Sequence, residues 1–312
     1  METIKIQRIL FATDFLESSR ISLDFAVAIA HHFQARMVMI HAIELSNAAR
    51  EAELTIHGPC VTRKGAMARL EAFAAGVRRT GLSVETFVDD EVPDQVVLDA
   101  VRRHGIDLLV LGVHGIHRGV EHLLIGSNTE KILLDSTCPT LTVGPHVMSG
   151  IDVKLHLEEI LYLSDFTPEA ARAAPYALWL GESFGVPVDI CQLLPLIAED
   201  NQGLKEEIAG NYCETMKRAL NSEESAWCLP AYQLDRRTAV DQILDRAKSQ
   251  TAGIIVLGVK IQSHLGRHLH TSFAYQLLAK ATCPILTISG EHRGTSGTID
   301  IFRGKDTMPG LG

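Results

Sequence analysis

Leu108-Leu-Val-Leu-Gly-Val-His-Gly115, together with Gly126-Ser-Asn-Thr-Glu-Lys-Ile-Leu-Leu134, is the part of the chain that decides its fold. The first four residues are continuously apolar, as in a strand that is buried on both faces, and the second segment has helical spacing. Glycines between such a strand and such a helix let backbone N–H groups approach an anion, and the helix dipole favours negative charge there. Ordinary tight turns also use glycine, so the pattern needs support from its context.

The context is an internal repeat. Ile9-Leu-Phe-Ala-Thr-Asp-Phe15 matches Ile160-Leu-Tyr-Leu-Ser-Asp-Phe166, and Ser136-Thr-Cys-Pro-Thr-Leu-Thr-Val143 matches Ala281-Thr-Cys-Pro-Ile-Leu-Thr-Ile288. Between these ends, an Asp-Gln pair at 94 and 241 and a Val-Leu-Gly-Val run at 110 and 256 recur in the same order. We infer a duplicated domain, with one copy over residues 1–147 and the other over 153–290. Residues 291–312 contain too few apolar side chains to pack, and we expect a flexible tail.

Each copy alternates short apolar runs with helical patterns, which predicts a parallel sheet covered by helices on both faces. The expected strands of the first copy are 9–12, 37–41, 84–88, 108–111 and 140–143, and its helices are 19–33, 65–80, 94–104 and 127–135. The expected strands of the second copy are 160–163, 188–193, 231–234, 254–257 and 285–288, and its helices are 168–184, 204–222, 239–250 and 271–281. In such α/β sheets, ligands bind beyond the carboxyl ends of the strands, where Asp14, Ala42 and Gly112 fall.

Charge and composition narrow the class of protein. The 312 residues carry a formal net charge of -9, which argues against nucleic acid or an anionic membrane as a partner. The chain has no signal-peptide pattern and no apolar run long enough to span a bilayer, so we expect a cytoplasmic protein. Its six cysteines form no C-x-x-C pair, and Cys138 and Cys283 are best interpreted as small buried residues.

These motifs together resemble the universal stress protein (UspA) family, and the chain looks like a tandem two-domain member. The resemblance implies a five-stranded parallel sheet in each domain, of the adenine nucleotide alpha hydrolase-like, Rossmann-like kind, and ATP as a ligand of some members, with Mg²⁺ as an accompanying ion. The family's site positions correspond to the following residues of the first copy: Ala12, Thr13, Asp14, Ala42, Leu111, Gly112, Gly115, Gly126, Ser127 and Asn128. The resemblance also implies that the last strands, 140–143 and 285–288, pair the two domains, and it leaves a homodimer open.

Two departures from the family pattern bear on the site. Ten residues separate Gly115 from Gly126, where the family has nine. In the second copy, Ile261 and Thr271 replace the second and third glycines, so we expect that copy to be mainly structural. Non-ligand roles stay open as well, because Asp14 could cap the next helix or tie its own loop, and Ser127-x-x-Glu130 fits a capping box.

The sequence does not settle the function class. The loop lacks the Gly-Lys-Ser/Thr of a P-loop, so ATP binding with at most slow hydrolysis fits better than an efficient enzyme. A nucleotide-free interaction scaffold is the alternative. Histidines gather in both glycine loops, and we expect them to face solvent or phosphate rather than to bind a metal ion; they are His114, His117, His122, His264, His268 and His270.

Overall fold

The computed structural model describes most of the repeat and leaves out several loops. The described residues are 4–43, 62–113, 126–148, 157–165, 167–193, 232–234, 239–249, 253–259 and 273–289, with isolated positions between 203 and 214. The expected tail at 291–312, most of the expected helix at 204–222 and both histidine-bearing loops lie outside the described residues.

The described elements of the first copy occur where the apolar patterns predict them. Its strands are β1 (Arg8–Ala12), β2 (Arg36–Ala42), β3 (Val84–Asp89), β4 (Leu108–Gly112) and β5 (Thr140–Val143). Its helices are α1 (Glu17–Phe33), α3 (Arg63–Arg78), α4 (Pro93–His104) and α5 (Ser127–Asp135). Helix α4 shows why the boundaries are sharp: Pro93 begins it, and Gly105 ends it in the left-handed region at φ 58°.

The second copy repeats this order. Its described strands are β6 (Ile160–Ser164), β7 (Val188–Leu193), β8 (Tyr232–Leu234), β9 (Ile254–Val259) and β10 (Ile285–Ser289). Its described helices are α6 (Pro168–Phe184), α8 (Ala239–Ser249) and α9 (Phe273–Lys280). The side chain of Thr167 accepts a hydrogen bond from the Ala170 backbone N–H and so caps α6.

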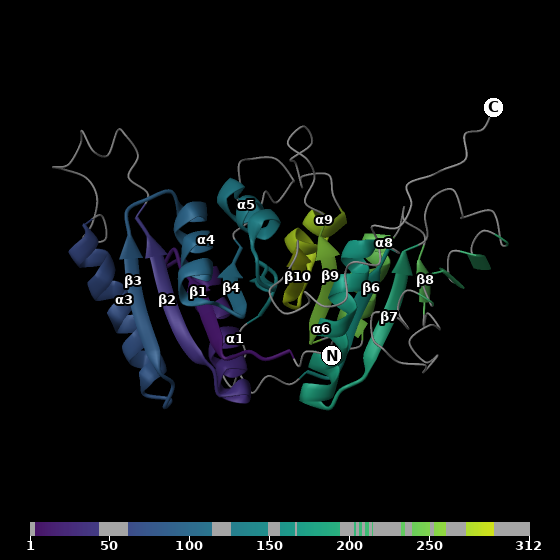
Figure 1. Cartoon of the computed structure of the whole chain (residues 1–312), viewed down its shortest axis with the longest axis horizontal. Coiled ribbons are helices and arrows are strands. Elements are labelled where there is room, and N and C mark those ends of the chain that lie inside the picture. Colours follow the sequence, from purple (N-terminus) through teal and green to yellow (C-terminus); the bar gives the residue numbers. More distant parts are fainter. Residues whose placement is uncertain are drawn as a thin grey trace.

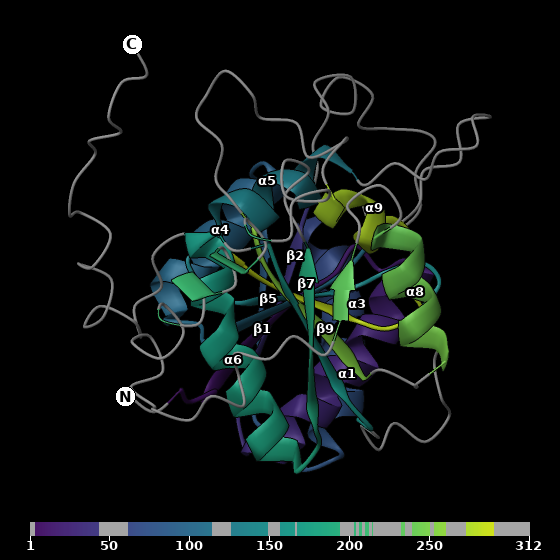
Figure 2. The same cartoon turned by 90° about the vertical axis from the view of Figure 1, so that its right-hand side faces the viewer.

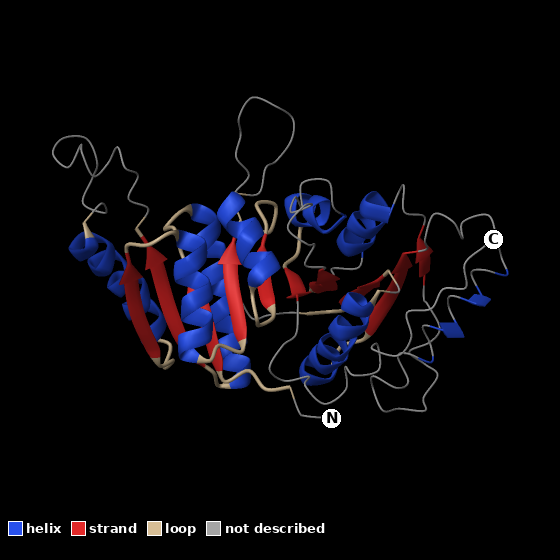
Figure 3. Ribbon diagram, turned by 45° about the horizontal axis from the view of Figure 1, so that its top comes forward, coloured by secondary structure: helices blue, strands red, loops and turns tan. Residues whose placement is uncertain are grey.

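The ten strands of the described residues form one sheet in the order β3-β2-β1-β4-β5-β10-β9-β6-β7-β8 (Figure 1). Within each copy, neighbouring strands are parallel, which confirms the predicted fold class. The copies meet where β5 and β10 pair antiparallel, with Leu141 opposite Leu286. The strands therefore run as a continuous twisted layer through the whole molecule (Figure 3).

Helices cover both faces of this sheet. Apolar side chains of α1, α3 and α6 pack with one face in a core that extends through both copies, from Met37 and Val110 to Val256. Helices α4 and α5 cover the other face in the first copy, and α8 and α9 cover it in the second. Figure 2, seen from the β8 side, shows α6 on one side of the strands and α8 and α9 on the other.

The described cysteines are buried in this framework, as expected for Cys138 and Cys283. Burial raises the pKa of each of these two thiols, and of the Cys191 thiol, to about 12. Because the thiolate is the reactive form, these side chains act as small core residues.

Hydroxyl groups line the seam between β5 and β10. Thr287 Oγ1 donates to the Thr140 carbonyl at 3.2 Å, and Ser289 Oγ donates to the Ser136 carbonyl at 2.8 Å. Thr142 Oγ1 is also buried, but it has no hydrogen-bond partner among the described residues.

We therefore expect Thr142→Val to stabilise the protein by about 1 kcal/mol, because the change removes a buried unsatisfied hydroxyl and keeps the shape of the side chain. The free energy of unfolding from urea titration measures this effect. Thr287→Val is the matched control, and it should destabilise the protein because it removes a hydrogen bond that is made. A loss of stability in Thr142→Val would show that this hydroxyl is satisfied.

A buried ion cluster joins the amino ends of β6 and β7 to α8. Arg246 forms an ion pair with Asp189, and its Nη2 lies 3.9 Å from Glu159 Oε1. All three side chains are less than 20% exposed. Burial, together with the hydrogen bond and the charge from Asp189, raises the pKa of Glu159 to about 7, although Arg246 opposes the shift. Glu159 is therefore protonated in the folded protein over a pH range in which it is ionised in the unfolded chain.

Stability should consequently fall as the pH rises from about 4.5, the ordinary value for a glutamate, through about 7. Glutamine keeps the neutral hydrogen-bonding form, so Glu159→Gln should flatten the stability curve over that window. Urea unfolding at several pH values measures how the free energy of unfolding changes with pH, and Glu158→Gln is the neighbouring control. A slope that is the same in Glu159→Gln as in the wild type would contradict the assignment.

Candidate functional site

The topological switch point of the first copy lies between β1 and β4. From β1 the chain passes through α1 to β2 on one side, whereas α4 carries it back across the sheet to β4 on the other side. Ala12 pairs with Leu111 in this register, so residues 12–14 and Gly112 end side by side at the same edge. Ala42, at the end of β2, is the next strand end along that edge. Strand connections that diverge in this way leave a crevice where ligands bind in α/β sheets.

The loop between β1 and α1 is held by the side chains of its own first residues. Asp14 Oδ1 accepts hydrogen bonds from the Leu16 N–H at 2.9 Å and from Ser19 Oγ at 2.6 Å. Thr13 Oγ1 accepts from the Phe15 N–H at 2.9 Å. Asp14 therefore ties its loop, which is one of the two non-ligand roles expected for it. The N-cap residue of α1 is Leu16.

Phe15 takes up a backbone conformation that is unusual for an aromatic residue. Its φ is 65°, in the left-handed region, which costs roughly 1–2 kcal/mol for a residue with a Cβ. Its ring lies 4.3 Å from the His41 ring and 5.6 Å from the Phe73 ring, measured between centroids. Arg69, from α3, covers the same ring at 4.6 Å and donates to the Phe15 carbonyl at 3.2 Å. These contacts hold the strained loop in place at the edge where the crevice opens.

His41, the penultimate residue of β2, lies beside this loop, and sequence reasoning missed it together with Phe15 and Arg69. Its Nδ1 lies 2.8 Å from the Thr13 carbonyl, so Nδ1 carries the proton and donates. Burial lowers the pKa of His41, against the opposing effects of the Thr13 carbonyl and Asp14, which favours the neutral imidazole. The signal in the sequence was a polar residue at the carboxyl end of an apolar strand, next to Ala42.

Helix α5 begins directly after a glycine. Gly126 is its N-cap residue, at φ -62°, and glycine has no side chain with which to cap the helix. The capping box expected at Ser127 is thus wrong, because the helix begins at Ser127 itself and its first internal bond runs from the Glu130 N–H to the Gly126 carbonyl. A Cβ added to Gly126 would meet no atom of the described residues within 4 Å. The first-turn N–H groups and this empty space together form a cradle that fits an anion.

Among the residues expected at the site, Gly115 lies outside the described residues, as do all six loop histidines. In the part of the chain that is described, no group of three or more His, Cys, Asp or Glu side chains could hold a metal ion. The described positions fall into two groups at the carboxyl edge of the first copy. One group is at the strand ends and the other at the start of α5; their members are Ala12, Thr13, Asp14, Ala42, Leu111, Gly112, Gly126, Ser127 and Asn128.

The second copy uses the corresponding positions for packing. Asp165, the counterpart of Asp14, accepts at Oδ1 from the Thr167 N–H at 3.2 Å and from the Thr167 hydroxyl at 2.5 Å. A Cβ on Gly258, the counterpart of Gly112, would overlap the Glu169 backbone and approach the Ala170 N to 2.7 Å. The first turn of α6 therefore lies directly on β9. The glycine at this position of the repeat is explained there by helix packing, without a ligand.

Comparison with known proteins agrees with this geometry. The model of the universal stress protein family matches the chain twice, over residues 5–144 and 156–289. The chain belongs to the universal stress protein family. It resembles the universal stress protein YxiE of Bacillus subtilis at 27% identity over 151 residues, which are 44% of this chain and 97% of that protein. It also resembles the universal stress protein MJ0531 of Methanocaldococcus jannaschii at 24% identity over 140 residues, which are 44% of this chain and 81% of that protein.

A solved structure shows the same fold along almost the whole chain. The universal stress protein from Archaeoglobus fulgidus DSM 4304 superposes with a TM-score of 0.66 at 17% identity, covering 93% of this chain and 99% of that one. The universal stress protein fold thus accounts for both copies at once. Within the described residues, no helix has the length and apolar content needed to cross a membrane.

Proposed function

We propose that the chain is an ATP-binding stress-response protein that holds the nucleotide at the carboxyl edge of its first copy. The single observation that carries the proposal is the start of α5 at Gly126, where no atom of the described residues fills the space that a side chain would take. A triphosphate supplies the negative charge that such a helix start favours. The chain's membership of the universal stress protein family and its switch point at β1 and β4 support the same location.

Different residues would contact different parts of the nucleotide. Ala12, Thr13 and Asp14 would meet the adenine and ribose side, and the backbone of Ala42 would line the adenine slot. Leu111 and Gly112 would pass beneath the ribose. Gly115 would cradle the phosphates, and the terminal phosphates, with Mg²⁺ if it accompanies them, would lie against Gly126, Ser127 and Asn128.

The second copy then serves as an internal partner that binds no nucleotide. Its Gly258 position is closed by α6, and β10 offers the strand with which β5 pairs. We propose the division into domains at 1–147 and 153–290, with pseudo-symmetric pairing inside one chain, and a homodimer of such chains as the alternative assembly. Buried cysteine thiols fit a reducing compartment, and we place the protein in the cytoplasm.

Titration of the purified full chain with labelled ATP and Mg²⁺ tests the proposal. We expect one site per chain, and we expect Asp14→Ala to weaken binding at least tenfold because the change removes the side chain at the ribose and frees its loop. Asp165→Ala is the matched control, since it frees the equivalent loop of the second copy and should leave the affinity unchanged. If the wild-type protein bound no ATP, it would be the nucleotide-free scaffold instead; release of ADP over many turnovers would make it a hydrolase.

A further inference from the structure

A second cavity lies far from the candidate nucleotide site, over the middle of the sheet. It has a volume of about 840 Å³, within the size range of small-molecule pockets. Helix α1 lines it with Ile29, and α6 lines it with Tyr176, Trp179, Leu180 and Phe184. None of the residues expected to hold nucleotide lines it.

The cavity exists because the helices leave the β5–β10 seam unevenly covered. Apolar residues of α5 and α9 pack together on one face of the seam. On the other face, α1 and α6 converge where Phe33 stacks on Trp179 and His32 stacks on Phe184, with centroids 4.8 and 3.9 Å apart. Away from this aromatic contact, the space between the two helices is the cavity, whose floor is Leu141 of β5 and Leu286 of β10.

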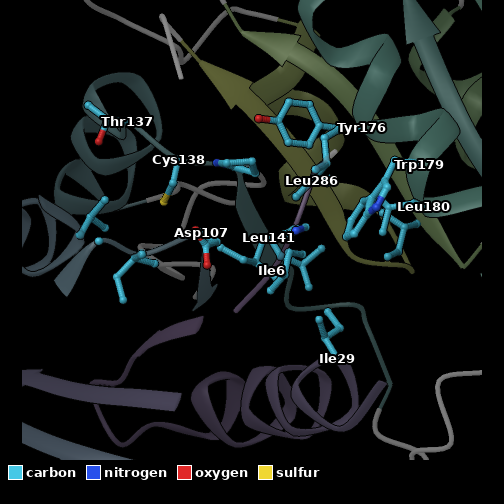
Figure 4. A pocket seen from close by; sticks show the side chains of 18 of the residues that line it. Ile6, Ile29, Asp107, Thr137, Cys138, Leu141, Tyr176, Trp179, Leu180 and Leu286 are labelled. Atoms are coloured by element: carbon cyan, nitrogen blue, oxygen red, sulfur yellow. The ribbon is translucent and has the colours of Figure 1, made fainter. Parts of the chain in front are cut away.

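The walls formed by α1 and α6 are apolar, and the charged side chains among the lining residues are Lys5, Arg102 and Asp107. Figure 4 shows Tyr176, Trp179 and Leu180 on one side, with Thr137, Cys138 and Asp107 across from them. Asp107 Oδ2 accepts from the backbone N–H groups of Gln7 and Arg8 at 2.8 and 2.9 Å. Within the described part of the chain, its Oδ1 accepts no further hydrogen bond, so the cavity ends at an acceptor that carries negative charge.

We propose that this cavity binds a small amphiphile, with its apolar body between α1 and α6 and a hydroxyl head that donates to Asp107. An apolar body of about ten carbons fits the walls, and its burial supplies the affinity. The carboxylate of Asp107 accepts a hydrogen bond from a hydroxyl head, and such a bond to a charged acceptor is stronger than one between neutral groups. The first copy contributes Asp107 and the second contributes Trp179, so the site needs both copies.

Straight-chain alcohols from hexanol to decanol, kept below their solubility limits, test the proposal through the fluorescence of Trp179. The chain has a second tryptophan, and Trp227→Phe leaves Trp179 as the single reporter. We expect saturable 1:1 quenching, with an affinity that rises about fourfold for each added methylene. Nonyl methyl ether, an isomer of decanol whose head cannot donate a hydrogen bond, should bind at least tenfold more weakly than decanol.

Two variants make the test specific. Leu180→Phe narrows the cavity and should shift the decanol affinity toward that of a shorter alcohol. Asp107→Asn should reduce the difference between decanol and nonyl methyl ether, whereas Glu85→Gln, at an exposed carboxylate outside the cavity, should keep it. Quenching that does not saturate, or a preference for decanol that Asp107→Asn leaves intact, would overturn the proposal. Because ATP is absent from these titrations, their outcome does not depend on the proposed nucleotide site.

Discussion

Replacing Gly126 with valine should abolish ATP binding while the protein stays folded. The new side chain would occupy the space in front of the first turn of α5, where no atom of the part of the chain that the structure describes lies within 4 Å of an added Cβ. Because φ at this position is -62°, valine meets no backbone strain there. Loss of two hydrogen bonds from helix N–H groups to phosphate, each about 1.5–3 kcal/mol, would weaken binding at least about a hundredfold.

Calorimetric titration of ATP into Gly126→Val and Gly126→Ala measures the effect, and circular dichroism checks the fold. Alanine, which adds less bulk, should have the smaller effect on affinity. Gly76→Ala is the control for a lost glycine: Gly76 lies within α3, where an added Cβ comes no nearer than 3.9 Å to a neighbour. That control should bind ATP normally and gain about 0.5–1 kcal/mol of stability. Wild-type affinity in Gly126→Val would remove α5 from the site.

In contrast to Gly126→Val, Gly258→Ala should cause a large loss of stability. The added Cβ would overlap the Glu169 backbone and lie 2.7 Å from the Ala170 N, and backbone cannot rotate away as a side chain can. Relief requires α6 to move off β9, which breaks a core shared by both copies, so we expect a cost of about 3 kcal/mol or more.

Urea unfolding measures this cost, with Gly126→Ala as the matched control for the same substitution at an open position. The two glycines occupy different positions of the repeat and are explained by different constraints, an open helix start at Gly126 and helix packing at Gly258. A cost below about 1 kcal/mol for Gly258→Ala would mean that α6 is not seated on β9, and the packing explanation of this glycine would then fail.

Most of the fold could be predicted because the strands are continuously apolar and the helices carry clear boundary residues. The runs at 108–111 and 254–257 have no polar interruption, and the predicted helix at 168–184 has the bounds of α6. Pairing between β5 and β10 was expected from the family resemblance, since nothing in an apolar strand indicates its neighbour. The capping box at Ser127 failed because glycine, with an extended backbone, can precede a helix without any side-chain cap.

The candidate site was less accessible to sequence reasoning than the fold. Asp14, Ala42 and Gly112 were found because strand ends can be counted along the chain. Arg69, from the middle of α3, and the left-handed Phe15 were missed, because their contact depends on how α3 packs over the loop after β1. The role of Gly258 was also hidden, since a glycine required by a neighbouring helix and a glycine required by a ligand look the same in a sequence.

The antiparallel pairing of β5 with β10 makes the association of the two copies independent of protein concentration. Two separate polypeptides that met through those edges would come apart on dilution, at a rate and to an extent set by their affinity. Here both edges are carried by one polypeptide, so the encounter is unimolecular and persists at any expression level. A copy that is joined in this way can lose its own binding site and still stay paired, because the pairing needs no encounter between separate chains.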